Sequence, residues 1–331
     1  MGIKSAGIVG LGSYLPKRIL TNGDLEKMVE TNDEWIKTRT GISERRIAAE
    51  DETTSDLALH AAEAALEDAG ISAEELDLII VASASPDMLF PATACILQEK
   101  LGIRGIPSFD LEAACAGFIY GLAVGAQFIA TGLSKNVLVV GAETLSRIIN
   151  WEDRNTCVLF GDGAGAAVLQ PVENCQGILS IHLGADGAGG DLLKVPAGGA
   201  SLPASLDTVH QGLHYMQMQG SEVFKFAVRV MGEAAEQGLV KAGLSKEDVA
   251  LVVPHQANVR IVNAAMRRLH LPMEKAYLNL DRYGNMSSAS IPVALDEAYR
   301  EKRIKHGDVI VMVGFGAGLT WGSIVMKWCK Q

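Results

Sequence analysis

The chain has 331 residues, of which 48% are apolar, and a formal net charge of −10. At roughly 100–200 residues per domain, this length predicts two domains, or two halves of one body. The apolar fraction is too high for a disordered or fibrous protein. The negative charge argues against general binding of nucleic acid.

The cysteines fit neither a disulfide framework nor a metal site. There are five of them, and no two have the C-x-x-C spacing. This use of cysteine suits a reducing cytoplasm. We expect no signal peptide, because the sequence runs directly into an apolar strand at 7–11. Four are interpreted as structural: Cys95 in a helix, Cys157 in an apolar strand, Cys175 in a polar loop and Cys329 at the chain end.

Two stretches repeat the same series of signals. Residues 69–80 and 242–253 each read as a helix end, a Gly stop, an acidic turn and a buried strand. Further on, a long helix ends near Gly132 in one case and near Gly307 in the other, and an apolar strand follows each.

A Gly-x-Gly-Ala-Gly run then occurs in each series, at 161–165 and 314–318. We infer an ancient duplication, with halves of 1–172 and 173–331. Alternating strands and helices predict mostly parallel sheets with helices on their faces.

Cys115 lies between a predicted strand at 106–111 and an apolar helix. Unpaired amides at a helix start stabilise a thiolate and lower its pKa, and the small neighbours of Cys115 leave the sulfur accessible. We therefore expect a nucleophile, with a buried structural cysteine as the alternative. The stretch 113–134 has no charged residue, so it suits a central buried helix, although its length also permits a membrane span.

The segment 185–212 is rich in Gly, Ala, Ser and Pro and lacks periodicity. A long irregular segment of this kind predicts a wall or lid of an active site, with a surface excursion as the alternative.

His255 follows a predicted buried strand at 249–253. It therefore projects from the carboxyl end of a strand, where ligands bind in α/β proteins. Among the seven histidines it alone combines a strand end with polar neighbours.

Asn285 lies in a Gly-containing turn before another helix. In the repeat this helix is the counterpart of the one led by Cys115, so we expect Asn285 and Cys115 at related positions about a pseudo-twofold axis. The alternative for Asn285 is an ordinary cap or turn residue.

With Cys115, His255 and Asn285 together, the sequence resembles the β-ketoacyl-acyl-carrier-protein synthase III family, the initiating condensing enzymes of bacterial fatty acid synthesis. The resemblance covers nearly the whole chain and rests on the motifs at 12–16, 33–36, 38–42, 113–118, 161–167, 254–258, 283–285 and 320–323. It implies a thiolase fold, in which duplicated α/β halves form a five-layered αβαβα body, and a homodimer.

The resemblance also implies the chemistry. Cys115 takes the acyl group of an acyl-CoA, acetyl-CoA by default, and malonyl-acyl-carrier protein then loses CO₂ and attacks the acyl-Cys115. His255 and Asn285 would stabilise the enolate as neutral donors. Backbone amides of Cys115 and Gly318 would form an oxyanion hole. CoA enters as a substrate, and neither a cofactor nor a metal is expected.

Further binding residues follow from the same resemblance. Trp35 and Arg154 would enclose the CoA adenine, with Arg39 near its phosphates and Asn258 near the pantetheine arm. Phe90 would gate the acyl pocket across the dimer. The basic residues expected to dock the acidic acyl-carrier protein are Lys225, Arg229, Arg260, Arg267 and Arg268; ordinary solvated helix faces are the alternative.

Four other functions compete with this interpretation. Relatives within the fold transfer acyl groups to other acceptors in secondary metabolism, and a non-catalytic relative would be expected to lack the cysteine. A papain-like protease also orders Cys, His and Asn along its chain, but with a different signature around the cysteine. A nucleotide-binding oxidoreductase would require the full G-x-G-x-x-G motif, which the Gly runs lack.

Overall fold

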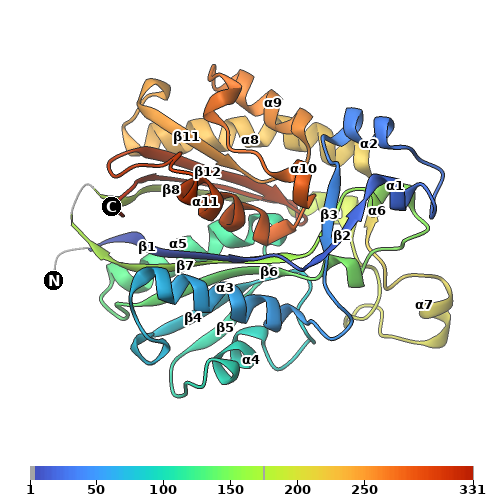
Figure 1. The fold of residues 1–331 in the computed structure, drawn as a ribbon, viewed down its shortest axis with the longest axis horizontal. Helices are drawn as coiled ribbons and strands as arrows, with labels where there is room; N and C mark the ends of the chain where they lie inside the picture. The colour runs from blue at the N-terminus through green and yellow to red at the C-terminus, as the bar shows by residue number, and fades with distance from the viewer. Residues whose placement is uncertain (1–3, 174–175, 331) are drawn as a thin grey trace.

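The structure, a computed structural model, describes residues 4–173 and 176–330. Two β-sheets lie between three layers of helices, as Figure 1 shows. Cys175 lies outside the described residues, so its predicted structural role is not addressed.

The first sheet belongs to the earlier part of the chain. Its strand order is β1 (Ser5–Tyr14), β7 (Gly163–Val172), β6 (Val137–Glu143), β4 (Leu78–Ala82) and β5 (Ser108–Leu111). Strand β4 runs parallel to β5 and β6, whereas β7 runs antiparallel to β1 and β6.

The second sheet repeats part of this arrangement. Its order is β11 (Val249–Pro254), β12 (Val309–Gly316), β13 (Thr320–Lys327) and β8 (Gly177–Ala185). Only β11 and β12 are parallel. The prediction of mostly parallel sheets is therefore wrong: β7 and β13 each pair antiparallel with the strand that precedes them in their own sheet, which makes both sheets mixed.

The helices complete the five layers. They are α3 (Thr54–Ala69) and α4 (Thr93–Lys100) on the outer face of the first sheet, α5 (Gly117–Ala130) and α11 (Ser290–Arg300) between the sheets, and α8 (Gly220–Ala242) and α9 (Val259–Arg268) on the outer face of the second. The predicted αβαβα order is thus present.

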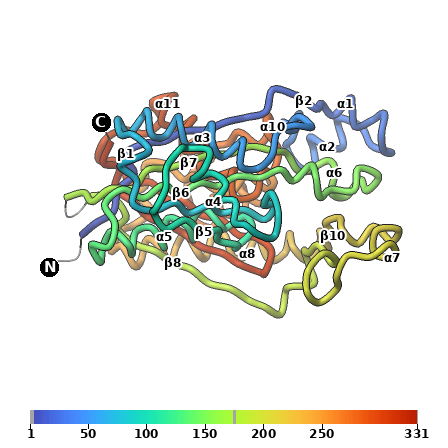
Figure 2. The backbone as a smooth tube through the Cα atoms, turned by 90° about the horizontal axis from the view of Figure 1, so that it is seen from below, coloured from blue at the N-terminus to red at the C-terminus, as the bar shows by residue number. Residues whose placement is uncertain are grey.

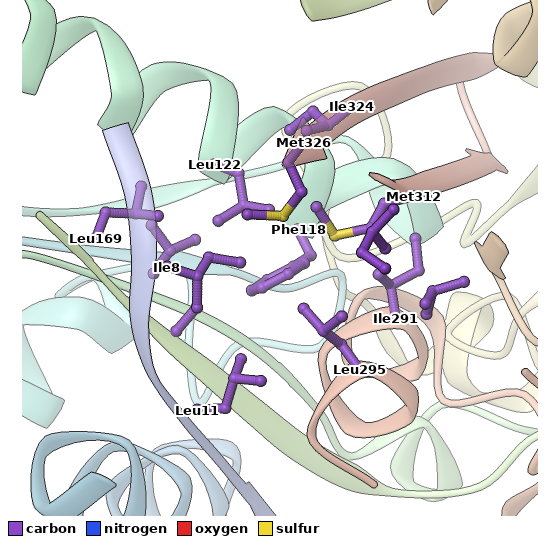
Figure 3. Close-up of a cluster of buried hydrophobic side chains, with 14 of the residues drawn as sticks. Ile8, Leu11, Phe118, Leu122, Leu169, Ile291, Leu295, Met312, Ile324 and Met326 are labelled. Atoms are coloured by element: carbon purple, nitrogen blue, oxygen red, sulfur yellow. The ribbon is translucent and has the colours of Figure 1, made fainter. Parts of the chain in front are cut away.

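The central layer forms the main core. Figure 3 shows Phe118 and Leu122 of α5 facing Met312 of β12 and Met326 of β13, and all four side chains are fully buried. The uncharged segment is therefore a buried central helix. Among the described residues, no helix has both the length and the apolar character needed to cross a membrane.

The repeated signals at 69–80 and 242–253 fold alike. Helices α3 and α8 both end at a left-handed glycine, Gly70 (φ 68°) and Gly243 (φ 67°). A capped 3-10 turn and a buried strand follow in each case. The strands of the first sheet end at Val172, and those of the second begin at Gly177. We retain the division into halves of 1–172 and 173–331 as a proposal.

The two Gly runs are not equivalent, contrary to the expectation. The run at 314–318 ends β12 and turns directly into β13, whereas the run at 161–165 opens β7. The reason is the connection between β6 and β7, residues 144–162, which replaces the tight turn of the second half with a long excursion.

The remaining elements are short. They are β2 (Arg18–Thr21), α1 (Asn22–Leu25), α2 (Asp33–Thr40), β3 (Glu44–Ile47), α6 (Arg154–Cys157), β9 (Leu193–Lys194), α7 (Leu206–His210), β10 (Gln217–Met218) and α10 (Leu280–Tyr283). Figures 1 and 2 place α1, α2, α6 and α7 at the end of the molecule opposite the marked chain termini.

Two local expectations need correction. Cys157 ends the short helix α6, which Asp153 caps, so the apolar run 156–160 is a helix and turn and not a strand. Only Phe160 makes a strand-like bridge, to Asn285. The segment 185–212 is not irregular throughout, because it contains a 3-10 helix (Gly187–Leu192), β9 and α7.

Candidate active site

Cys115 lies on a sharp turn between β5 and α5. A 3-10 helix, Ala114–Ala116, joins directly to α5, and Ala114 has a positive φ of 45°. A non-glycine residue in this region is strained and needs support from its surroundings. The turn thereby holds the thiol at the start of the central helix.

The second half contains a matching turn before α11. Its 3-10 helix is Ser287–Ala289, and Ser287 also has a φ of 45°. The residue that matches Cys115 is therefore Ser288. Asn285 lies three residues earlier, at the same turn, so Asn285 and Cys115 belong to corresponding turns without being matched residues.

The end of β12 packs closely on the Cys115 turn. A Cβ atom at Gly316 would lie 2.5 Å from the Cys115 nitrogen, so only glycine fits there. The Thr320 hydroxyl donates a hydrogen bond to the Ala113 carbonyl (2.9 Å). These contacts bring the second Gly run, including Gly318, beside the nucleophile.

His255 follows β11, as predicted, and only 1% of its surface is exposed. Its backbone nitrogen donates to the Val313 carbonyl (2.8 Å), and its ring meets Phe315 edge-on at 5.6 Å between centroids. Within the described part of the chain, neither ring nitrogen has a hydrogen-bond partner. Burial lowers the pKa of His255 to about 3, so the ring is neutral at pH 7.

Asn285 is fixed by its backbone and by its side chain. Its nitrogen donates to the Leu159 carbonyl (2.8 Å), and its carbonyl accepts from Gly161 (3.0 Å). The side-chain Oδ1 accepts the Ser287 amide (2.8 Å). This leaves the Nδ2 donors on the other side of the carboxamide, which lines a cavity.

Cys115, His255 and Asn285 line one cavity together. Most of its walls are apolar, contributed by Leu159, Phe160, Leu193, Met218, Val223, Phe224, Ile261 and Phe315. Phe224 also borders a surface groove lined by Arg260 and Arg267. The three side chains that the sequence singled out therefore meet at the inner end of a passage from the surface.

Cys115 also borders a second cavity of about 540 Å³, within the range of small-molecule pockets. Its apolar walls are Met88, Leu89, Leu145, Ile148, Phe160, Leu193, Val195 and Met216, and Gly318 borders it as well. The segment 185–212 thus forms a wall of the site through Gly190 and Val195. A long ligand can enter by the first cavity and place an apolar end in the second.

The thiol environment differs from the expectation. Burial raises the pKa of Cys115 to about 12. The Ser287 hydroxyl, which makes no hydrogen bond of ordinary geometry within the described residues, lies near the thiol and acts in the opposite direction. The predicted lowering of the pKa by the helix start is therefore outweighed by burial.

This pKa predicts how alkylation of Cys115 depends on pH. Below a pKa of about 12, the thiolate fraction rises about tenfold per pH unit. Labelling of Cys115 by iodoacetamide is expected to follow that rise from about pH 7 to about pH 9, as measured by peptide mass spectrometry. A plateau below about pH 8.5 would mean that the helix start outweighs burial.

Comparison with known proteins gives the family. The family model 3-oxoacyl-[acyl-carrier-protein (ACP)] synthase III matches residues 109–187, and its C-terminal counterpart matches 239–328. The chain is 62% identical over 327 residues to the β-ketoacyl-[acyl-carrier-protein] synthase III of Desulfitobacterium hafniense (strain DSM 10664 / DCB-2), covering 99% of each chain.

The chain belongs to the β-ketoacyl-[acyl-carrier-protein] synthase III family.

Other relatives agree. The family member of Caldanaerobacter subterraneus subsp. tengcongensis is 60% identical, with 98% of each chain covered. The crystal structure of the 3-oxoacyl-[acyl-carrier-protein] synthase III of Aquifex aeolicus VF5 superposes with a TM-score of 0.90 at 50% identity, over 98% of this chain and 100% of that one. The predicted family, thiolase fold and condensing-enzyme class are confirmed, and the secondary-metabolism alternative is not favoured.

The residues that the family resemblance assigned to CoA lie at the α2–α6 end. The Arg154 guanidinium lies 5.0 Å from the centre of the Trp35 ring, and that of Arg39 lies 5.9 Å from it. An adenine between Trp35 and Arg154 needs about 7 Å, or two van der Waals contacts. The two side chains therefore have to move apart to admit it.

Asn258 caps α9 and also joins it to α2. Its Oδ1 accepts from the Arg260 nitrogen (2.8 Å), and its Nδ2 donates to the Arg39 carbonyl (2.9 Å). Asn258 borders the cavity of Cys115 as well. Asn258 therefore lines the passage, while the polar atoms of its side chain cap α9 and join it to α2.

The basic residues on α8 and α9 differ in their surroundings. Lys225 pairs with Glu222 (2.8 Å), and Arg268 contacts Glu233 (3.3 Å) and Glu236 (3.7 Å). The guanidinium groups of Arg229 and Arg260 lie over the rings of Phe226 and Phe224. Arg260 and Arg267 line the groove at the mouth of the passage, and no ion pair is formed by either of them within the described residues.

Phe90 borders neither of the two cavities at Cys115. Its side chain is 84% exposed, whereas its neighbours Met88 and Leu89 border the second cavity. This position separates Phe90 from the site within one chain.

Sequence reasoning missed several site residues. Phe160, which pairs with Asn285, was placed in a strand without a role. Phe224 and Leu193 lie in no recognisable motif, and only the three-dimensional structure shows that they line the cavity of Cys115. Glu143 was not singled out either, although a lone acidic residue in an apolar strand, as at 137–143, is a usable signal.

Proposed function

We propose that this chain condenses an acyl-CoA with malonyl-acyl-carrier protein through an acyl-Cys115 intermediate and thereby initiates fatty acid synthesis. The observation that carries the proposal is the meeting of Cys115 with two neutral, buried side chains, His255 and Asn285, in one passage. The neutral His255 ring carries one N–H, and neither ring nitrogen has a hydrogen-bond partner among the described residues, so this N–H can be donated to a substrate oxygen.

The first half-reaction acylates Cys115. The Cys115 sulfur bonds to the thioester carbon, the bond from that carbon to the CoA sulfur breaks, and the thiol proton ends on CoA. Burial raises the pKa of Cys115, so the thiol is protonated before the reaction. The sulfur must therefore lose this proton as it attacks the bound thioester. Backbone amides of Cys115 and Gly318 are proposed to hold the oxyanion, since the Gly run packs on the Cys115 turn.

The second half-reaction uses the other two side chains. The malonyl C–CO₂ bond breaks, CO₂ leaves, and its electron pair forms an enolate on the thioester. The enolate oxygen accepts hydrogen bonds from His255 and Asn285. The enolate carbon then bonds to the acyl carbon, the bond from that carbon to the Cys115 sulfur breaks, and the departing thiolate takes up one proton from water to restore the thiol. A histidine with a pKa of about 3 stays neutral at pH 7. It can donate its N–H to the enolate oxygen without taking up a proton itself.

The test is stoichiometric turnover. The purified chain with acetyl-CoA and malonyl-acyl-carrier protein is expected to release CoA and CO₂ in equal amounts and to form acetoacetyl-acyl-carrier protein. Release of CoA without CO₂ would instead indicate acyl transfer to another acceptor.

The surface around the passage supports a role for α2, α6 and α9 in binding CoA. We infer that Trp35 and Arg154 separate to hold the adenine, that Arg39 meets the phosphates, and that Asn258 borders the pantetheine arm. The aromatic ring and guanidinium groups suit an adenine and its phosphates.

The acyl-carrier protein is proposed to dock on α8 and α9, through Lys225, Arg229, Arg260, Arg267 and Arg268. The double change Lys225→Glu with Arg260→Glu is expected to raise KM for malonyl-acyl-carrier protein about tenfold, because two attractive charges become repulsive. Steady-state kinetics measures it. Arg104→Glu, a single charge reversal at an exposed residue after α4, is the control. Unchanged carrier-protein kinetics in the double variant would remove this docking surface.

A homodimer is proposed on two features, one in the first sheet and one in the loop between β4 and α4. Strand β5 is an edge strand, which invites pairing. Met88, Leu89 and Phe90 form an apolar run with exposures of 50%, 78% and 84%. In a dimer this run would be covered, and Phe90 could reach the partner's acyl cavity.

Phe90→Ala tests that position. The change is expected to shift the ratio of acylation rates, hexanoyl-CoA over acetyl-CoA, about tenfold towards the longer chain, because it removes a bulky wall. Stopped acylation reactions analysed by mass spectrometry give both rates. An unchanged ratio would exclude gating by Phe90.

A further inference from the structure

Glu143 is a buried carboxyl group that the chemistry above does not use. It ends β6, and none of its surface is exposed. Burial raises its pKa. A buried carboxyl without a cationic partner is costly unless hydrogen bonds compensate for the lost water.

The carboxyl group joins the two halves of the fold. On one side it accepts from the Ser85 hydroxyl (2.6 Å) and from the Ala84 nitrogen (3.1 Å). On the other side it accepts from the Ser288 hydroxyl (2.8 Å) and nitrogen (3.3 Å). Strand β6 approaches this second turn so closely that a Cβ atom at Gly141 would lie 2.4 Å from the Ser288 carbonyl oxygen.

Ser288 leads directly to Asn285. Its neighbour Ser287 holds the strained positive φ of 45° and donates its amide to the Asn285 Oδ1 (2.8 Å). A strained turn persists only where surrounding groups fix it. The carboxyl of Glu143 is the ionisable group that holds this turn from the opposite half.

The contact between Glu143 and Ser288 does not depend on ionisation. The Ser288 hydroxyl also lies 2.8 Å from the Ala82 carbonyl oxygen, and it has one proton to donate. If Glu143 is ionised, Ser288 donates to it. If Glu143 is protonated, it can donate to Ser288, which then donates to Ala82.

We propose that Glu143 is a positioning residue for the condensation half-reaction: it holds the Ser287–Ser288 turn so that the Asn285 carboxamide faces the enolate oxygen. This rests on the proposed function. The acylation half-reaction depends on the Cys115 turn and the Gly run, to which Glu143 makes no hydrogen bond among those described. The negative charge of Glu143 contributes to the raised pKa of Cys115, so replacing it by a neutral group is not expected to slow acylation. The two half-reactions therefore separate its positioning role from general support of the fold.

The test measures both half-reactions in Glu143→Gln, which keeps the shape but turns one acceptor oxygen into a donor. Acylation by acetyl-CoA is expected within about threefold of wild type. Discharge of the isolated acyl-enzyme by malonyl-acyl-carrier protein is expected to slow about 10–100-fold, the effect of a small misplacement of a reacting group. Intact-mass time courses give both rates.

Asp296→Asn is the matched control. Asp296 is another buried carboxyl, on α11, and it binds Ser13 (2.6 Å) and Arg300 (2.8 Å) away from the site. Its change is expected to alter thermal stability without separating the two rates. Ser288→Ala, which removes one donor to Glu143, is expected to reproduce the separation and decides the matter if Glu143→Gln does not fold.

Failure of the proposed function can be distinguished from failure of the positioning role of Glu143. If wild type is neither acylated nor discharged, the proposed function fails. If wild type does both, but Glu143→Gln, or Ser288→Ala in its place, slows both half-reactions equally or neither, the positioning role is rejected.

Discussion

Cys115→Ala is expected to lower formation of the β-ketoacyl product by at least about 10⁴-fold, because removing a covalent nucleophile removes the whole two-step route. Cys115 borders both cavities, so the proposed nucleophile can be reached from each of them. Product formation from acetyl-CoA and malonyl-acyl-carrier protein measures the loss.

Cys329→Ala is the control for this change. Burial also raises the pKa of Cys329, but its sulfur lies against the Ile8 carbonyl of β1 (3.4 Å), outside both site cavities. Wild-type turnover is expected. Substantial turnover in Cys115→Ala would contradict the covalent intermediate.

His255→Ala and Asn285→Ala are each expected to slow discharge of the acyl-enzyme by about 10²–10³-fold, corresponding to about 3–4 kcal/mol of transition-state stabilisation. Acylation of Cys115 is expected to continue, because the donors proposed for that step are backbone amides. The proposed role requires only a neutral N–H donor, and the His255 ring, neutral at pH 7, has no hydrogen-bond partner among the described residues. Separate time courses of adduct formation and discharge measure the effect.

His182→Ala serves as the control for His255→Ala. Burial lowers the pKa of His182 as well, but this residue lies in β8 and does not border the cavity of Cys115. Equal slowing of acylation and discharge in His255→Ala or Asn285→Ala would contradict the division of labour between the two half-reactions.

Much of the site followed from local patterns. A strand end before His255 and a strand-to-helix turn at Cys115 are short-range signals, and the structure has both. The helix ends at Gly70 and Gly243 could also be predicted from the sequence, because a left-handed cap favours glycine. Family resemblance then brought these separate segments together.

The features that could not be predicted from the sequence depend on contacts between distant segments of the chain. The match between Cys115 and Ser288 requires the φ values of two turns, not the motif letters. The raised pKa of Cys115 depends on how completely other elements cover the thiol, which a helix-start argument omits. Glu143 has no motif, and its partners come from both halves of the chain.

Intact-mass spectrometry of the chain after incubation with acetyl-CoA, and again after malonyl-acyl-carrier protein is added, tests the central claim most directly. Wild type is expected to carry one acetyl adduct, located at Cys115 by peptide mapping, absent from Cys115→Ala, and discharged as acetoacetyl-acyl-carrier protein. An adduct on another residue, or one on Cys115 that malonyl-acyl-carrier protein does not discharge, would contradict it.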